Sequence, residues 1–146
     1  MSNKVEDLEP DVQEMCLAFL QKCAQQGITL RVTQTRRTWD EQAKIYAQGR
    51  TTPGKVVTHA PPGHSWHQFG RAFDVAEMDK TPYDLGEPGF KDDDPLWEYI
   101  GAIGESVGLE WGGRWKRPDR PHFEHHGGTT LAALRAAHTN VGDGLA

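Results

Sequence analysis

A histidine and an aspartate lie seven positions apart in the segment HSWHQFGRAFDV, residues 64–75. Imidazole nitrogens and carboxylate oxygens are common zinc ligands, and a catalytic zinc site uses three protein ligands with a fourth position left for water. Gly70 allows a turn that brings His67 and Asp74 together. The pair could instead form a local hydrogen bond, because short motifs also match by chance. Both interpretations are open at this point.

A third ligand could come from the segment PDRPHFEHH, residues 118–126, which contains three histidines. Pro121 disfavours a helix and favours an extended chain before it, so His122 is expected to begin a strand. Because side chains alternate along a strand, His122 and Glu124 should share one face. Asp119 precedes this strand by a turn, close enough to contact a metal-bound water without being a ligand.

Hydrophobic spacing and capping signals predict the elements that position these residues. A helix is expected over residues 10–26, because apolar residues recur there every three to four positions. Alternation predicts a strand over residues 28–35, and Thr38 or Asp40 can cap a second helix that runs to about Gln48.

The second half of the chain is punctuated by proline and glycine. Its predicted elements are a strand over residues 71–78, a helix from Pro95 to Val107, short strands within residues 109–115 and 122–126, a helix over residues 129–138, and a flexible tail over residues 139–146. Helices and strands are mixed without a βαβ rhythm, which favours an α+β fold. We therefore expect one domain over residues 1–146, with a small antiparallel β-sheet flanked by helices.

The composition excludes several classes of function. The chain has 146 residues and a formal net charge of −5, which argues against nucleic acid or an anionic membrane as the main partner. It contains no apolar run of about 18 residues and no apolar segment typical of a Sec signal peptide near residue 1. Cys16 and Cys23 lie two helical turns apart, too far for a disulfide. We expect a monomeric protein that is at first cytoplasmic, without stable membrane insertion.

The two segments described first resemble one known family. SWHQFGRAFD resembles the SxHxxGxxxD pattern of zinc peptidases related to D-alanyl-D-alanine carboxypeptidases, which share a fold with the amino-terminal domain of hedgehog proteins. WGGRWKRPDRPHFE resembles the second half of that site. The resemblance spans about residues 27–124 and implies a hedgehog/DD-peptidase-like fold that binds Zn²⁺. It also implies the zinc ligands His67, Asp74 and His122.

Within this family the chain is similar to L-alanyl-D-glutamate peptidases of phages and bacteria. TQTRRTWDEQAKIYAQGRT, residues 33–51, resembles one of their stretches. Asp119 occupies the place of the Glu in the ExxH motif of the vancomycin-resistance dipeptidases. The resemblance implies that Asp119 is the catalytic acid–base and Arg37 the substrate-binding cation, with Arg36 as the alternative. Ser65 is expected either to touch substrate or to bond local backbone.

The function implied by this resemblance is hydrolysis of the L-alanyl-D-glutamate bond in peptidoglycan stem peptides. The enzyme would be a phage endolysin, held in the host cytoplasm until a separate holin releases it to the cell wall. The alternatives are a D-alanyl-D-alanine carboxypeptidase or dipeptidase, and a catalytically silent hedgehog-like binding module. Asp119 argues against the silent module, because binding needs no base.

Two further features have more than one interpretation. The run Asp92–Asp94 could bind calcium, or it could be a solvated helix N-terminus that Asp94 caps. Trp111 and Trp115 could line the cleft, although we expect at least one of them to pack in the core.

Overall fold

Four antiparallel strands form one sheet in the computed structural model, which describes residues 1–78 and 94–141. The strands are β1 (Leu30–Gln34), β2 (Ala72–Glu77), β3 (Glu110–Trp111) and β4 (His122–Glu124), in the spatial order β1-β2-β4-β3. The two central strands are therefore those that carry the aspartate and the histidine proposed as ligands. The α+β class with a small antiparallel sheet is confirmed.

Within the described residues the helices are α1 (Pro10–Gln25), α2 (Trp39–Ala47), α3 (Leu96–Ser106) and α4 (Leu131–Val141), with short 3-10 helices η1 (Val5–Asp7), η2 (Trp66–Phe69) and η4 (Gly112–Arg114). Thr38 caps α2 in a reciprocal capping box with Glu41, as its sequence predicts. None of these helices has the length and apolar character needed to cross a membrane.

Two predictions fall at the edges of the described residues. Asp94 does cap α3, because its Oδ1 accepts a hydrogen bond from the backbone N–H of Leu96 at 2.9 Å. The rest of the acidic run lies outside the described residues, so calcium binding there stays a prediction. The last helix reaches Val141 rather than His138, and residues 142–146 of the predicted tail lie outside the described part.

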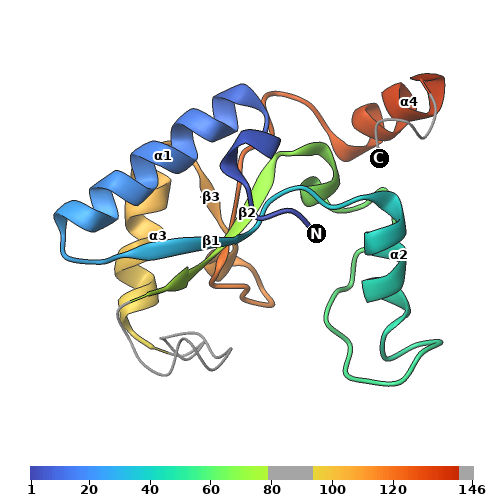
Figure 1. Cartoon of the computed structure of the whole chain (residues 1–146), viewed down its shortest axis with the longest axis horizontal. Coiled ribbons are helices and arrows are strands. Elements are labelled where there is room, and N and C mark those ends of the chain that lie inside the picture. The colour runs from blue at the N-terminus through green and yellow to red at the C-terminus, as the bar shows by residue number, and fades with distance from the viewer. Residues whose placement is uncertain (79–93, 142–146) are drawn as a thin grey trace.

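The hydrophobic core lies between one face of the sheet and the helices α1 and α3, which Figure 1 shows beside each other and apart from α2 and α4. Phe73 and Phe123 are directly opposed on β2 and β4, and Phe19 of α1 packs on Phe123 with ring centroids 4.5 Å apart. Cys16 and Cys23 are free and buried here. Because side chains alternate along a strand, the neighbours of these phenylalanines point to the opposite face of the sheet.

Helix α3 approaches the sheet closely through two buried glycines. A Cβ atom at Gly101 would lie 2.2 Å from the ring of Trp111, and one at Gly104 would lie 2.4 Å from the ring of Phe123. The buried Trp111 also donates a hydrogen bond from Nε1 to the backbone oxygen of Arg120 at 2.7 Å. One of the two tryptophans is therefore a core residue, and it supports the segment that precedes β4.

This close approach predicts that Gly101→Ala destabilises the protein. Alanine normally stabilises a helix interior over glycine by about 0.5–1 kcal/mol, but here its methyl group would overlap the indole. We expect the free energy of unfolding, measured by urea denaturation, to fall by about 1–3 kcal/mol. The matched control is Ala102→Gly on the exposed face of α3, which should lose only about 1 kcal/mol. A more stable Gly101→Ala variant would contradict the packing described.

Candidate metal centre and active site

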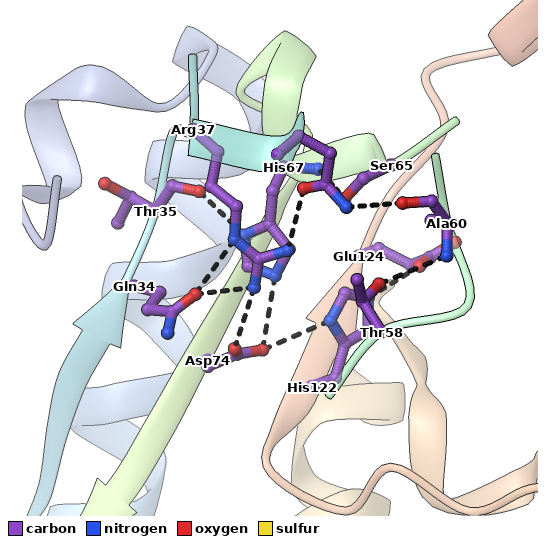
Figure 2. A network of polar contacts seen from close by, with 11 residues as sticks. Gln34, Thr35, Arg37, Thr58, Ala60, Ser65, His67, Asp74, His122 and Glu124 are labelled. Carbon is purple, nitrogen blue, oxygen red and sulfur yellow. Dashed lines mark hydrogen bonds and ion pairs between the residues drawn. The ribbon is translucent and has the colours of Figure 1, made fainter. Parts of the chain in front are cut away.

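The three predicted metal ligands meet on the face of the sheet that points away from α1 and α3. Asp74 of β2 lies directly opposite His122 of β4 in the strand register, and His67 comes from η2. One candidate ligand atom from each of the three lies within 4.8 Å of the others. Figure 2 shows contacts running from Asp74 to both imidazoles. The structure thus brings together residues that the sequence separates by up to 55 positions.

A short turn fixes the orientation of His67. Ser65 caps η2 by accepting a hydrogen bond at Oγ from the backbone N–H of His67, 3.3 Å away, and Gly70 ends the turn with a φ of 69°. The imidazole Nδ1 lies 2.7 Å from the backbone oxygen of Thr35, so we assign the proton to Nδ1. The buried Nε2 then presents its lone pair, has no hydrogen-bond partner among the described residues, and lies 3.3 Å from Oδ1 of Asp74.

The second imidazole is oriented in a complementary way. His122 Nε2 lies 2.7 Å from Oε1 of Glu124, and its Nδ1 lies 3.1 Å from Oδ1 of Asp74. With the proton on Nε2, the lone pairs of both imidazoles and of the carboxylate converge on one point. A cation between these atoms would satisfy all three, and two imidazoles with one carboxylate form a ligand set found at catalytic zinc sites. The residues therefore fit a zinc ion.

The pKa values of the three groups agree with a cation site. Burial lowers the pKa of His67, which favours the neutral imidazole that a metal requires. Burial also opposes the charged form of His122, but its hydrogen bonds to Asp74 and Glu124 outweigh this and raise the pKa of His122 to about 10. Burial would raise the pKa of Asp74, yet its close contacts with the His67 and His122 imidazoles hold that pKa well below its usual range.

The two candidate arginines lie in different places. The half-buried Arg37 donates to Oε1 of Gln34 at 3.0 Å from Nε and at 2.5 Å from Nη2, and to Oε1 of Gln42 at 3.2 Å. Its Nη2 also lies 3.8 Å from Oδ2 of Asp74. Arg36 instead donates to backbone oxygens outside the cleft, one of them in the first ten residues. Of the two, Arg37 is the one that faces the metal ligands.

Asp119 lies on a turn between η4 and β4. Its backbone N–H donates to the backbone oxygen of Gly112 at 2.9 Å, and its backbone oxygen accepts from the backbone N–H of His122 at 3.2 Å. The turn requires glycine at 112, because a Cβ there would lie 2.5 Å from the Asp119 oxygen. Partial desolvation in the cleft and the negative charge of Asp74 raise the pKa of Asp119, although nearby cations oppose the shift. The carboxyl is beside the ligand group and not part of it.

All six predicted site residues line one open cleft of about 980 Å³. Part of the opposite wall comes from the loop of residues 48–64, which follows α2 and contributes His59 and His64. Trp115 also lines the cleft, half-exposed, with its ring centroid 5.0 Å from that of His122. Ser65 lines the cleft while bonding local backbone, so its contact with substrate stays a prediction.

Sequence reasoning missed the residues that hold the ligands in place. Gln42 is fully buried, binds Arg37 through Oε1, and donates from Nε2 to the backbone oxygen of Ala60 at 2.7 Å. A glutamine on the inward face of an amphipathic helix was the available signal. The backbone oxygen of Thr35, which orients His67, could not be recognised in the sequence, because every residue type has a backbone oxygen.

Comparisons with known proteins identify the family of the chain. Residues 5–117 match the family model of VanY, D-alanyl-D-alanine carboxypeptidase, which includes His67 and Asp74 and ends before Asp119 and His122. The chain is also 37% identical over 122 residues to the peptidoglycan L-alanyl-D-glutamate endopeptidase CwlK of Bacillus subtilis (strain 168), a match that covers 81% of this chain and 73% of the relative.

Solved structures share the fold at low sequence identity. The Serratia marcescens L-Ala D-Glu endopeptidase ChiX matches with a TM-score of 0.59 and 20% identity, over 89% of this chain and 86% of that one. A mutant of the vancomycin resistance D,D-pentapeptidase VanY, from a VanB-type resistance cassette and in complex with Zn(II), matches with a TM-score of 0.60 and 14% identity, over 88% and 78% of the two chains. Because the family model covers most of the sequence and a relative exceeds 30% identity, the chain belongs to the VanY D-alanyl-D-alanine carboxypeptidase family.

Proposed function

We propose that this protein is a zinc-dependent endopeptidase that hydrolyses the L-alanyl-D-glutamate bond of peptidoglycan stem peptides. The observation that carries the proposal is the convergence of the lone pairs of His67, Asp74 and His122 in an open cleft that also contains Asp119 and Arg37. The choice of bond is supported by the relationship to CwlK, which is an endopeptidase of that specificity.

The cleft supplies the groups that amide hydrolysis needs. A zinc ion held by His67, Asp74 and His122 would act as a Lewis acid on the scissile carbonyl and lower the pKa of water. Asp119 accepts a proton from the attacking water and delivers it to the leaving amine, as general base and then general acid. Its raised pKa makes the carboxylate a stronger base for the first transfer, and acid–base catalysis is most efficient when the pKa of the catalytic group lies close to the operating pH.

Arg37 is placed to bind negative charge on the substrate. Its guanidinium is fixed by two glutamine oxygens and faces the cleft beside Asp74, so little side-chain freedom is lost on binding. A fixed, planar donor binds a carboxylate of the stem peptide or the oxyanion that develops during attack. Trp115 offers an apolar surface for the peptide on the same wall as Asp119.

The phage context is a separate part of the proposal. The resemblance of residues 33–51 is to peptidases of both phages and bacteria, so the role of an endolysin that a holin releases from the host cytoplasm stays a prediction. A monomeric state, likewise, stays a prediction.

The bond specificity can be tested by digestion of purified peptidoglycan. We expect new amino-terminal D-glutamate, detected by mass spectrometry of the products, and no activity after treatment with a chelator until zinc is restored. The second candidate function is a D-alanyl-D-alanine carboxypeptidase, which the description of the matched family favours. Release of free D-alanine without new D-glutamate termini would replace the endopeptidase assignment with that one.

The ligand assignment predicts that His67→Ala abolishes zinc binding. Removing one of three ligands leaves an incomplete site, so elemental analysis should find far less than the roughly one ion per chain of the wild type. The exposed His64, three positions earlier on the cleft wall, provides the matched control, and His64→Ala should keep its zinc. Full zinc occupancy in His67→Ala would show that the ligands have been assigned wrongly.

The proton-transfer role predicts that Asp119→Asn loses turnover but not metal. Asparagine keeps the size of the side chain and cannot accept the proton, so turnover should fall by about 10²–10⁴-fold. Zinc content should match the wild type, since the three ligands are unchanged.

The control for this variant is Asp40→Asn, which changes an exposed carboxylate of α2 outside the cleft and should leave turnover unchanged. In the wild type, the acid limb of kcat/KM should lie above the ordinary aspartate pKa of 3.8, because the raised pKa keeps Asp119 protonated at a higher pH. Loss of zinc from Asp119→Asn would make Asp119 a ligand and not the base.

A further inference from the structure

The hydrogen bonds around His122 continue beyond the metal ligands. Glu124 contacts His122 Nε2 with Oε1, at 2.7 Å, and its other oxygen, Oε2, contacts Nε2 of His126. The ring of His126 is stacked on the indole of Trp66, with centroids 3.9 Å apart and planes inclined by 7°. Trp66 directly precedes His67. The chain of contacts thus begins at the ligand on β4 and returns to the turn that carries the ligand on η2.

Glu124 is buried directly behind the His122 imidazole. It is 3% exposed, and its register partner on β2 is Ala72, which is small enough to leave the carboxylate room beside the imidazole. Oε1 faces Nε2, the nitrogen on the far side of the ring from the convergent lone pairs. A buried carboxylate is costly unless its oxygens are paired, and here both are paired with imidazoles.

A carboxylate in this position controls a metal-binding histidine. By accepting the Nε2 proton it fixes the tautomer that leaves Nδ1 free for the metal, and it makes the imidazole a stronger donor. His126 occupies the second oxygen of Glu124 and so limits rotation of the carboxylate. The stack on Trp66 in turn holds the ring of His126 in one plane.

We propose that Glu124 and His126 are a positioning pair for the His122 ligand: Glu124 sets the tautomer and donor strength of His122, and His126 acts through Glu124. The pair is locked to η2 by the stack of His126 on Trp66. This inference rests on the proposed zinc site, and it concerns metal affinity and geometry rather than which bond is cleaved.

The test measures zinc affinity by competition with a chelator, which requires no catalytic activity. Glu124→Gln keeps the shape and an acceptor oxygen but removes the charge, so the zinc dissociation constant should rise about 10–100-fold. The Co²⁺-substituted variant should also show an altered visible absorption spectrum, because the donor strength of one ligand has changed. A purely structural role would leave the spectrum of the folded, metal-loaded protein as in the wild type.

A double-mutant cycle tests the order of action. His126→Gln should weaken zinc binding in the wild-type background and have little further effect in the Glu124→Gln background, because residues that act through one another are not additive. His125→Gln is the matched control. That neighbouring imidazole contacts Arg71 and a backbone N–H, and no described contact joins it to a metal ligand, so zinc affinity should be unchanged.

Three results would overturn the proposal. The first is a folded Glu124→Gln variant with wild-type zinc affinity and Co²⁺ spectrum. The second is full additivity of the two substitutions. The third is binding of two zinc ions by the wild type and one by His126→Gln, because Glu110, Glu124 and His126 also offer ligand atoms within 4.8 Å of one another and would then form a second metal site. A wild type that binds zinc but cleaves no peptidoglycan would refute the proposed function alone.

Discussion

The direct pairing of Asp74 with His122 across β2 and β4 is the constraint on which the site depends. The neighbouring pair in the same register is Phe73 with Phe123, which forms the centre of the core. A slip of one residue would turn the phenylalanines toward the cleft and the ligands toward α1 and α3. Burial of the aromatic rings and assembly of the metal ligands therefore require the same strand register, and the apolar face stabilises the polar one.

Asp74 also links the candidate metal ligands to Arg37, the positively charged side chain in the cleft. One carboxylate oxygen lies among the imidazole nitrogens, while the other lies 3.8 Å from Arg37. The side chain is thus shared between the candidate metal ligands and the arginine that is proposed to bind the anionic part of a peptide. Because Arg37 is held by glutamines rather than by a second acid, it keeps a positive charge available to a ligand.

The sequence predicts those features that depend on local rules. Alternation locates β1, Pro121 marks the start of β4, Gly70 predicts the turn after His67, and Thr38 is one of the two predicted caps of α2. Features that depend on contacts between residues far apart in the sequence were not predictable. A one-residue irregularity between Val32 and Gln34 in the register of β1 with β2 places Gln34 opposite Asp74, and nothing local indicates it. The hydrogen bond between His67 and a backbone oxygen is likewise not indicated by any local pattern. The same is true of the stacking of Trp66 on an imidazole that is distant in the sequence.

The loop of residues 48–64 forms part of the cleft wall but contributes none of the candidate metal ligands. Segments of this kind tolerate insertions, deletions and substitutions far better than strands in a sheet do. The shape of this part of the cleft is therefore encoded in a different stretch of the chain from the candidate ligands. In the course of evolution, or in the laboratory, the loop can change in sequence and length while the strand register that assembles the ligands is inherited unchanged.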